Sequence, residues 1–141
     1  MAVRLETVEY PDPVARATIG TGLGQFNEAD VGPADRRGLA VFVRDEHDAV
    51  VGGLSGFTAW GWLYVQWLWL DELWRGKRLA AKMLAMAEAE AQKRGCHGAH
   101  IDTFNPLALK AYQRAGYVIF GQLDDFPKGR TRYFLQRRLD S

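Results

Sequence analysis

The sequence predicts a mixed α/β fold, in which helices cover the faces of one β-sheet. Residues 64–70 are nearly all aromatic or aliphatic, which is typical of a buried strand. The period then changes, and apolar residues recur at helical spacing from about residue 77 to residue 94. The same order of strand and helix returns at residues 98–104 and 105–115. These observations predict a parallel strand pair joined by a right-handed helical crossover.

The amino-terminal third has weaker signals. Residues 3–8 alternate weakly between apolar and polar, which predicts a first strand that Pro11 and Pro13 end. Residues 14–33 contain Ile19, Leu23 and Phe26 at helical spacing, but three glycines between them disfavour a stable helix. We therefore expect a flexible helix-loop region, either a wall of a substrate site or an ordinary surface connection.

The middle of the chain predicts an antiparallel hairpin and a central strand. Residues 38–44 and 50–58 are strand-like and flank a polar turn. In the central strand, simple alternation places Val65, Trp67 and Trp69 on one face. The same alternation places Tyr64, Gln66, Leu68 and Leu70 on the other face.

The long helix after the central strand has an apolar face and a polar face. The apolar face comprises Leu79, Ala80, Met83, Leu84, Ala87 and Ala91. The polar face comprises Lys82, Glu88, Gln92 and Lys93. Gly95 follows, at the position where helices commonly end in a left-handed residue.

The carboxy-terminal part continues the α/β pattern. Asn105 and Pro106 predict the start of a helix, and Gly116 predicts its end. Strands are predicted at residues 117–123 and 131–137. In such a sheet, ligands bind at the carboxyl ends of the parallel strands, here residues 64–70 and 98–104.

Composition limits the function classes. A chain of 141 residues fits a single domain, residues 1–141, and a net charge of +1 gives no reason to expect a nucleic-acid partner. Apolar runs are too short for a membrane span. Cys96 is the single cysteine, so an internal disulfide is excluded and a cytoplasmic location is expected. The three histidines lack ligand spacing, so we expect no metal site.

A basic turn precedes the long helix. Arg75, Gly76, Lys77 and Arg78 lie where positive side chains oppose the helix dipole. This placement is favourable if an anion binds the free amides of the first turn, and Gly76 would let the backbone approach it closely. A solvated basic turn is the alternative.

Two motifs resemble those of the GNAT superfamily of N-acetyltransferases, in particular its small bacterial members. Arg75-Gly-Lys-Arg-Leu-Ala80 is similar to the (Q/R)xxGx(G/A) signature, with Arg78 in place of the middle glycine. Asn105, Ala108, Tyr112, Gly116 and Tyr117 match a second block, N-x-x-A-x-x-x-Y-x-x-x-G-(F/Y), in register. Arg78 fits the motif in helical φ/ψ, where its side chain either crowds the phosphates or bonds to one of them.

The resemblance implies the fold, the co-substrate and the site. It implies a central, mostly antiparallel sheet of six to seven strands flanked by helices, and acetyl-CoA as co-substrate. Tyr112 is the implied acid for the leaving thiolate, although the residue alone fits a core aromatic equally well. The expected acetyl-CoA-binding residues are Leu68, Trp69, Leu70, Arg75, Gly76, Lys77, Arg78, Leu79, Ala80, Asn105, Ala108 and Tyr112.

The base and the acceptor stay open. Asp71 and Glu72 are the preferred candidate bases, and His100, Asp102 or bulk water are alternatives. A backbone amide near Leu68–Leu70 would polarise the thioester carbonyl if the strand is bulged or splayed. We expect direct acetyl transfer to a primary amine of a small molecule, the alternatives being a protein amine or a non-catalytic acyl-CoA-binding module. Exposed aromatics and an unpaired strand edge also suggest a homodimer.

Overall fold

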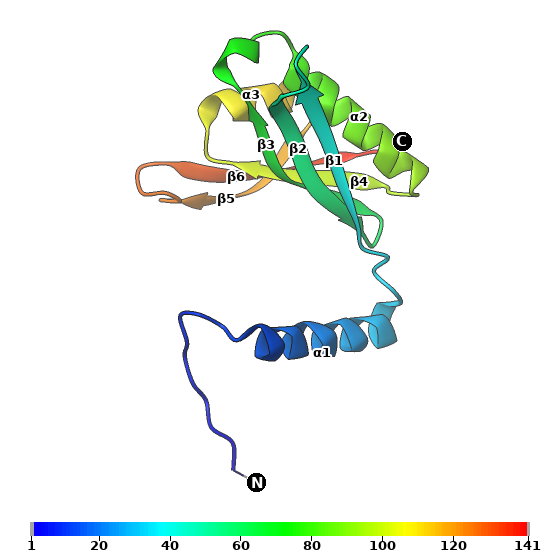
Figure 1. The fold of residues 1–141 in the computed structure, drawn as a ribbon, viewed down its shortest axis with the longest axis vertical. Helices are drawn as coiled ribbons and strands as arrows, with labels where there is room; N and C mark the ends of the chain where they lie inside the picture. Colours follow the sequence, from blue (N-terminus) through cyan, green and yellow to red (C-terminus); the bar gives the residue numbers. More distant parts are fainter. Residues whose placement is uncertain (1, 141) are drawn as a thin grey trace. The chain divides into compact units, whose positions relative to one another are not determined.

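Six strands form one sheet in the spatial order β1-β2-β3-β4-β6-β5 (Figure 1). This computed structural model describes residues 2–140. The strands are β1 (Arg37–Arg44), β2 (Val50–Ala59), β3 (Trp62–Leu70), β4 (Gly98–Thr103), β5 (Val118–Asp124) and β6 (Thr131–Arg138). The helices are α1 (Pro13–Val31), α2 (Leu79–Lys93) and α3 (Pro106–Arg114), and a short 3-10 turn spans Glu72–Trp74.

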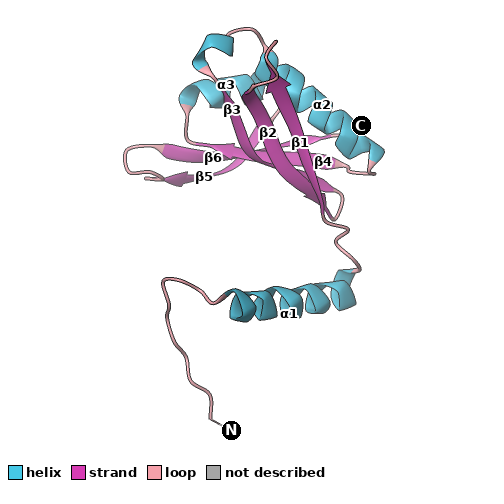
Figure 2. Cartoon of the chain, in the orientation of Figure 1, coloured by secondary structure: helices cyan, strands magenta, loops and turns pink. Residues whose placement is uncertain are grey.

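The sheet is mixed but mostly antiparallel, as predicted. The β3–β4 pair is parallel, and the other neighbouring pairs are antiparallel. α2 connects β3 to β4, as the crossover prediction requires. Figure 2 shows all six strands and the helices α2 and α3 in one layered body.

The chain consists of two compact units, residues 1–34 and residues 35–141. The smaller unit contains α1, and the larger unit contains the sheet. The single-domain interpretation of residues 1–141 therefore stays a prediction.

The predicted strand at residues 3–8 was wrong, because these residues have no regular secondary structure. Weak alternation without a paired neighbour does not stabilise a strand. The glycine-rich segment after it forms one continuous 19-residue helix, where a helix-loop region was expected. The Asp12 side chain caps this helix by accepting a hydrogen bond from the Ala15 amide at 2.9 Å, and Pro13 occupies its first turn. These start signals prevail over the cost of the glycines.

α2 packs its apolar face on the sheet, where Met83, Leu84, Ala87 and Ala91 are buried. Glu88 was predicted on the polar face, but it is buried as well. It accepts hydrogen bonds of 2.7 Å from the Tyr117 hydroxyl and from the Arg137 guanidinium. Helical periodicity missed this residue because partners distant in sequence satisfy its charge.

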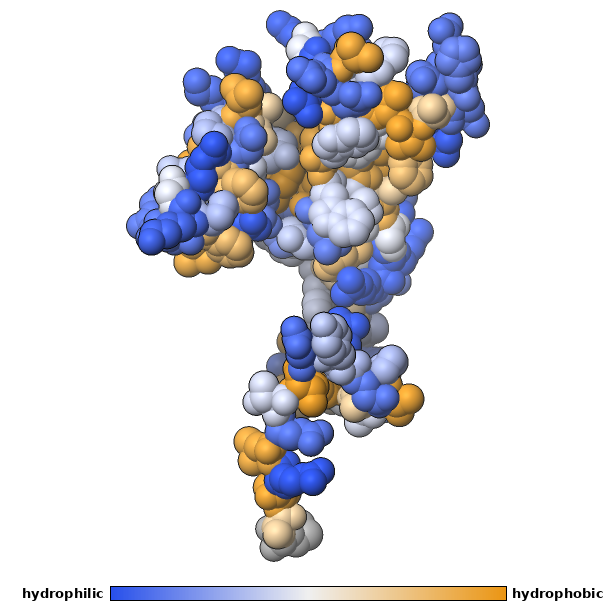
Figure 3. Space-filling model, turned by 60° about the vertical axis from the view of Figure 1, so that its left-hand side comes forward, coloured by the Kyte–Doolittle hydropathy of each residue, from blue (hydrophilic) through white to orange (hydrophobic). Residues whose placement is uncertain are grey.

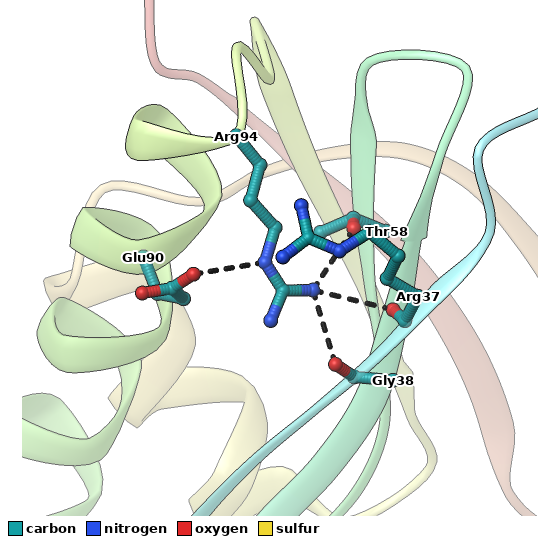
Figure 4. Close-up of polar contacts among 5 residues, drawn as sticks. All are labelled: Arg37, Gly38, Thr58, Glu90 and Arg94. Carbon is teal, nitrogen blue, oxygen red and sulfur yellow. Dashed lines mark hydrogen bonds and ion pairs between the residues drawn. The ribbon is translucent and has the colours of Figure 1, made fainter.

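Arg94 ties the carboxyl end of α2 to the first two strands (Figure 4). Its guanidinium donates to the carbonyls of Arg37 and Gly38 and to the Thr58 hydroxyl, at 3.0–3.3 Å. Its Nε donates to Glu90 at 2.9 Å. These bonds hold one end of α2 against the sheet.

Candidate active site

The sheet opens in its centre, between β3 and β4. Parallel pairing covers Trp62 to Val65 on β3 and ends at the pair Val65–Ile101. Beyond this pair β3 continues to Leu70 beside β2 alone. Figure 1 shows β1, β2 and β3 running at a steep angle across β4 and β6. The structure therefore contains the splayed strand that the carbonyl-polarising amide requires.

A β-bulge lies at the start of the opening. The register of β2 against β3 changes from Gly56–Val65 to Ser55–Trp67, so Gln66 is the extra residue. Gly56 allows this close approach, because a Cβ there would clash with the Tyr64 carbonyl oxygen. The extra residue shifts the alternation of the two faces by one position for all residues of β3 that follow it.

Because of the bulge, the predicted faces of the central strand were wrong. Leu63 and Val65 are buried before it, and Leu70 is buried after it. Trp67 and Trp69, which were predicted to share a face with Val65, are 68% and 56% exposed. One inserted residue reverses the alternation of every residue that follows it.

The backbone of β3 beyond the bulge offers hydrogen-bonding groups to the opening. The Asp71 amide donates to the Val51 carbonyl of β2 at 2.8 Å. Because successive residues of a strand direct their amides to opposite sides, the amides of Leu70 and Leu68 are directed away from β2. Both residues lie beyond the last β3–β4 pair, so their amides face the side where β4 has separated.

The predicted anion site lies directly after this strand. α2 has no capping side chain, and its first hydrogen bond runs from the Lys82 amide to the Arg78 carbonyl. The amides of Leu79 and Ala80 therefore have no partner within the helix. Arg75 donates from Nε to the Leu70 carbonyl at 2.9 Å, which connects the basic turn to the end of β3.

Arg78 does not have the expected right-handed helical conformation. Its φ and ψ are 59° and 23°, in the left-handed region that favours glycine. Gly76 also has a positive φ of 76°, and no atom lies within 4 Å of the place where its Cβ would be. The motif position that Arg78 occupies is therefore one where the backbone itself favours glycine. The Arg78 side chain is exposed to solvent.

α3 carries the second motif. Tyr112 is 5% exposed, and burial together with the charge of Asp102 raises the pKa of its hydroxyl to about 12. The Asn105 side-chain oxygen caps the helix by accepting bonds from the amides of Leu107 and Ala108, at 2.9 and 3.1 Å. Asn105 therefore has the capping role that the sequence allowed, and its amide nitrogen is the group left for a ligand. Ala108 is half-buried against the core.

The candidate bases lie in two groups. Asp71 and Glu72 follow β3 at the start of the 3-10 turn, where Asp71 is half-buried and Glu72 is exposed. His100 and Asp102 share a face of β4. Burial lowers the pKa of His100, so its ring is neutral at neutral pH.

Asp102 also belongs to a network that sequence reasoning missed. Tyr64 donates its hydroxyl proton to one carboxylate oxygen of Asp102 at 3.1 Å, and Arg132 donates to the other oxygen at 2.9 Å. Tyr64 was assigned only to a strand face, because nothing in the sequence pairs it with residues 38 and 68 positions away.

Comparisons with known proteins match residues 4–117 to the acetyltransferase (GNAT) family. The chain belongs to this family. It is 46% identical to an acetyltransferase of Agrobacterium fabrum over 92% of this chain and 95% of the relative. It is 33% identical to a blasticidin-S acetyltransferase of Streptomyces morookaense over 96% of each chain. A solved acetyltransferase structure from Agrobacterium tumefaciens superimposes with a TM-score of 0.88 at 44% identity, covering 98% of this chain and 99% of the other.

This GNAT protein is an acetyl-CoA-dependent N-acetyltransferase. Acetyl-CoA carries a pyrophosphate, and the residues before α2 fit such a group. They combine free amides, the open space beside Gly76 and the basic side chains of Arg75, Lys77 and Arg78. The match to the family confirms the resemblance drawn from the two motifs.

Among residues 2–140, no three His, Cys, Asp or Glu side chains lie together in a way that would hold a metal ion. Within the same residues, no helix has the length and apolar character needed to cross a membrane.

Proposed function

We propose that this GNAT enzyme transfers the acetyl group of acetyl-CoA directly to a primary amine of a small molecule. The observation that carries the proposal is the opening between β3 and β4. α2 begins after the first of these strands and α3 after the second, so both motifs lie at the carboxyl ends of the separating strands. No metal takes part in the proposed reaction, because backbone amides supply the positive end that a thioester carbonyl requires.

In this proposal each part of the site has one role. The basic turn and the first amides of α2 bind the pyrophosphate. The amides of Leu68 and Leu70 stabilise the negative charge that develops on the carbonyl oxygen when the amine attacks. Tyr112 then gives its proton to the sulfur that leaves, and with a pKa of about 12 its hydroxyl is protonated at neutral pH when the thiolate forms.

The amine has to lose a proton before or during attack. We propose Asp71 or Glu72 as the group that receives it, directly or through water. Glu72 is exposed and Asp71 is half-buried, so solvent reaches this end of β3 and carries the proton away. His100 and Asp102 are less suited, because burial makes the stacked His100 ring a weaker base and Asp102 accepts hydrogen bonds through both oxygens.

A small-molecule acceptor is supported by the relative named blasticidin-S acetyltransferase. The test is release of free CoA from acetyl-CoA in the presence of spermidine, tyramine, lysine, kanamycin, blasticidin S or a peptide with a free amino terminus. We expect one of the small amines to be acetylated faster than the peptide. Faster acetylation of the peptide would contradict a small-molecule acceptor and would indicate a protein acceptor instead.

We also propose that the protein forms a homodimer in the cytoplasm. Ile19, Leu23 and Phe26 lie at helical spacing on α1 and are 58–72% exposed, and α1 has no buried residue. Hydrophobic side chains, coloured orange in Figure 3, also stay exposed on the sheet-containing unit. Association with a second copy would remove such surface from water. Light scattering of the wild type and of Leu23→Glu tests this: a mass of 15.9 kDa for the wild type would contradict it.

A further inference from the structure

A tyrosine, a carboxylate and an arginine form a chain of hydrogen bonds across three strands. Tyr64 of β3 donates to Asp102 of β4, which also accepts a bond from Arg132 of β6. The side chains of Asp102 and Arg132 are 17% and 23% exposed. The Arg132 guanidinium also lies over the Phe126 ring, 4.0 Å from its centre. The carboxylate therefore has a fixed partner on each oxygen.

This network lies where the sheet opens. Tyr64 pairs with His100, one residue before the last β3–β4 pair, and Asp102 is the first residue of β4 beyond that pair. The Tyr64 ring stacks on the His100 ring with 4.7 Å between centres, and the Phe57 ring meets it edge-on at 5.6 Å. Rings on both sides fix the direction of the hydroxyl.

The hydrogen bond to Asp102 decides what the hydroxyl can bind. A tyrosine hydroxyl has one proton to donate and lone pairs to accept. In Tyr64 the proton is committed to Asp102, and burial together with the Asp102 charge raises the pKa of Tyr64, so the hydroxyl keeps this proton. The remaining lone pairs can only accept a hydrogen bond, so this site selects an N–H or O–H donor.

The charges of the network also favour the reactive form of an amine. The negative Asp102 and the positive Arg132 are 2.9 Å apart and offset each other. The hydroxyl is therefore not part of a strongly negative site that would hold an amine in its protonated, unreactive form. A neutral amine, which still has N–H groups to donate, is the species that this geometry suits.

We propose that the Tyr64 hydroxyl binds the acceptor amine by accepting a hydrogen bond from its N–H group, and that Asp102 and Arg132 are positioning residues that fix this hydroxyl. This inference rests on the proposed function, since it assigns the acceptor side of the same opening. Tyr64 is thereby a specificity-determining residue on β3, on the acceptor side of the opening, and it is distinct from the residues proposed to bind the cofactor.

The chain contains a matched control. Tyr117 donates to Glu88, and Glu88 also pairs with Arg137, so a phenol, a carboxylate and a guanidinium form a second network of the same kind on the buried side of α2. Tyr64→Phe and Tyr117→Phe each remove one hydroxyl that is bonded to a carboxylate. A merely structural role of Tyr64 predicts that both variants behave alike.

The experiment measures KM for the amine, KM for acetyl-CoA and Tm for the wild type and both variants. Tyramine and spermidine are the fixed probes, and the panel amine that the wild type acetylates fastest is added. For Tyr64→Phe we expect KM for the amine to rise about 10-fold, which corresponds to ~1.4 kcal/mol, while KM for acetyl-CoA stays unchanged. For Tyr117→Phe we expect a lower Tm and unchanged KM values.

Two results would overturn this inference without contradicting the proposed function. One is a Tyr64→Phe enzyme with an unchanged KM for the amine. The other is a rise of both KM values together with a fall in Tm, since that would show a structural tie between strands. If the wild type acetylates no amine at all, the proposed function fails, and this inference fails with it.

Discussion

The left-handed conformation of Arg78 leads to a prediction about stability, in which the contribution of the backbone can be separated from that of the side chain. The perturbation is a pair of substitutions, Arg78→Gly and Arg78→Ala, at φ 59° and ψ 23°. Both remove an exposed guanidinium, so the loss of charge is common to the two variants. Only glycine also removes the Cβ that crowds the carbonyl oxygen in this region of φ and ψ.

The expected difference follows from the backbone. A non-glycine residue in the left-handed region costs roughly 1–2 kcal/mol, so we expect the glycine variant to be more stable than the alanine variant by about 1 kcal/mol. For a chain of this length, ~1 kcal/mol changes Tm by about 3–4 °C. Thermal and urea unfolding without ligand measure the difference. Equal stability of the two variants, or greater stability of the alanine variant, would refute the reasoning.

The same two variants test how the Arg78 side chain affects the binding of acetyl-CoA. If the guanidinium bonds to a phosphate, both variants bind acetyl-CoA more weakly than the wild type. If it crowds the phosphates, both bind more tightly. Because the side chain is absent in both, a difference in binding between the two variants measures the backbone of the turn.

Three further predictions concern Tyr112 and Arg94. Tyr112→Phe should lower kcat by about 100-fold or more, the usual contribution of a general acid, with acetyl-CoA binding retained in a melting assay; an unchanged kcat would contradict its role. The Tyr112 pKa of about 12 lies above the ordinary value of 10, so its contribution to stability is complete below pH 10 and is lost as the pH rises through 12. Other tyrosines with raised pKa values remain in Tyr112→Phe, so the measured quantity is a difference: the unfolding free energy of the wild type should fall by about 3 kcal/mol more over this range than that of Tyr112→Phe. An equal fall in both proteins would contradict the raised pKa of Tyr112. Arg94→Met should lower the free energy of unfolding in urea by about 2–3 kcal/mol, because the buried Thr58 and two backbone carbonyls lose a charged donor. The control is Arg138→Met, which removes an exposed ion pair with Asp140 and should lower it by almost nothing.

The sequence predicts regular elements well where the period is strong. Apolar side chains recur at helical spacing in residues 77–94, and both ends of α2 lie within two residues of the ends of that range. Asn105 and Pro106 start α3 as predicted, because a cap and a proline act locally. The hairpin of β1 and β2 also forms as predicted.

Features that depend on distant partners were not predictable. The bulge at Gln66 exists because β2 and β3 change register, and an aromatic and aliphatic run on both sides of it gives no sign of the change. Glu88 is buried because Tyr117 and Arg137 reach it from other elements. The Tyr64–Asp102–Arg132 network joins three strands in the same way.

The motifs gave the candidate site, but its conformation came from the structure. The departure at Arg78 was visible in the sequence, whereas its left-handed backbone was not. The opening of the sheet was a requirement of the chemistry, and the end of pairing at Val65 and Ile101 meets it.

The most direct test of the account is a thermal melt with and without acetyl-CoA, on the wild type and on Arg75→Ala. The account places the pyrophosphate on the turn between β3 and α2. It predicts that ligand at about 100 times Kd stabilises the wild type by roughly 2.7 kcal/mol and raises Tm by several degrees. The rise should be smaller for Arg75→Ala at the same ligand concentration. No rise for the wild type at millimolar acetyl-CoA, or an equal rise in the variant, would contradict the assignment of this turn.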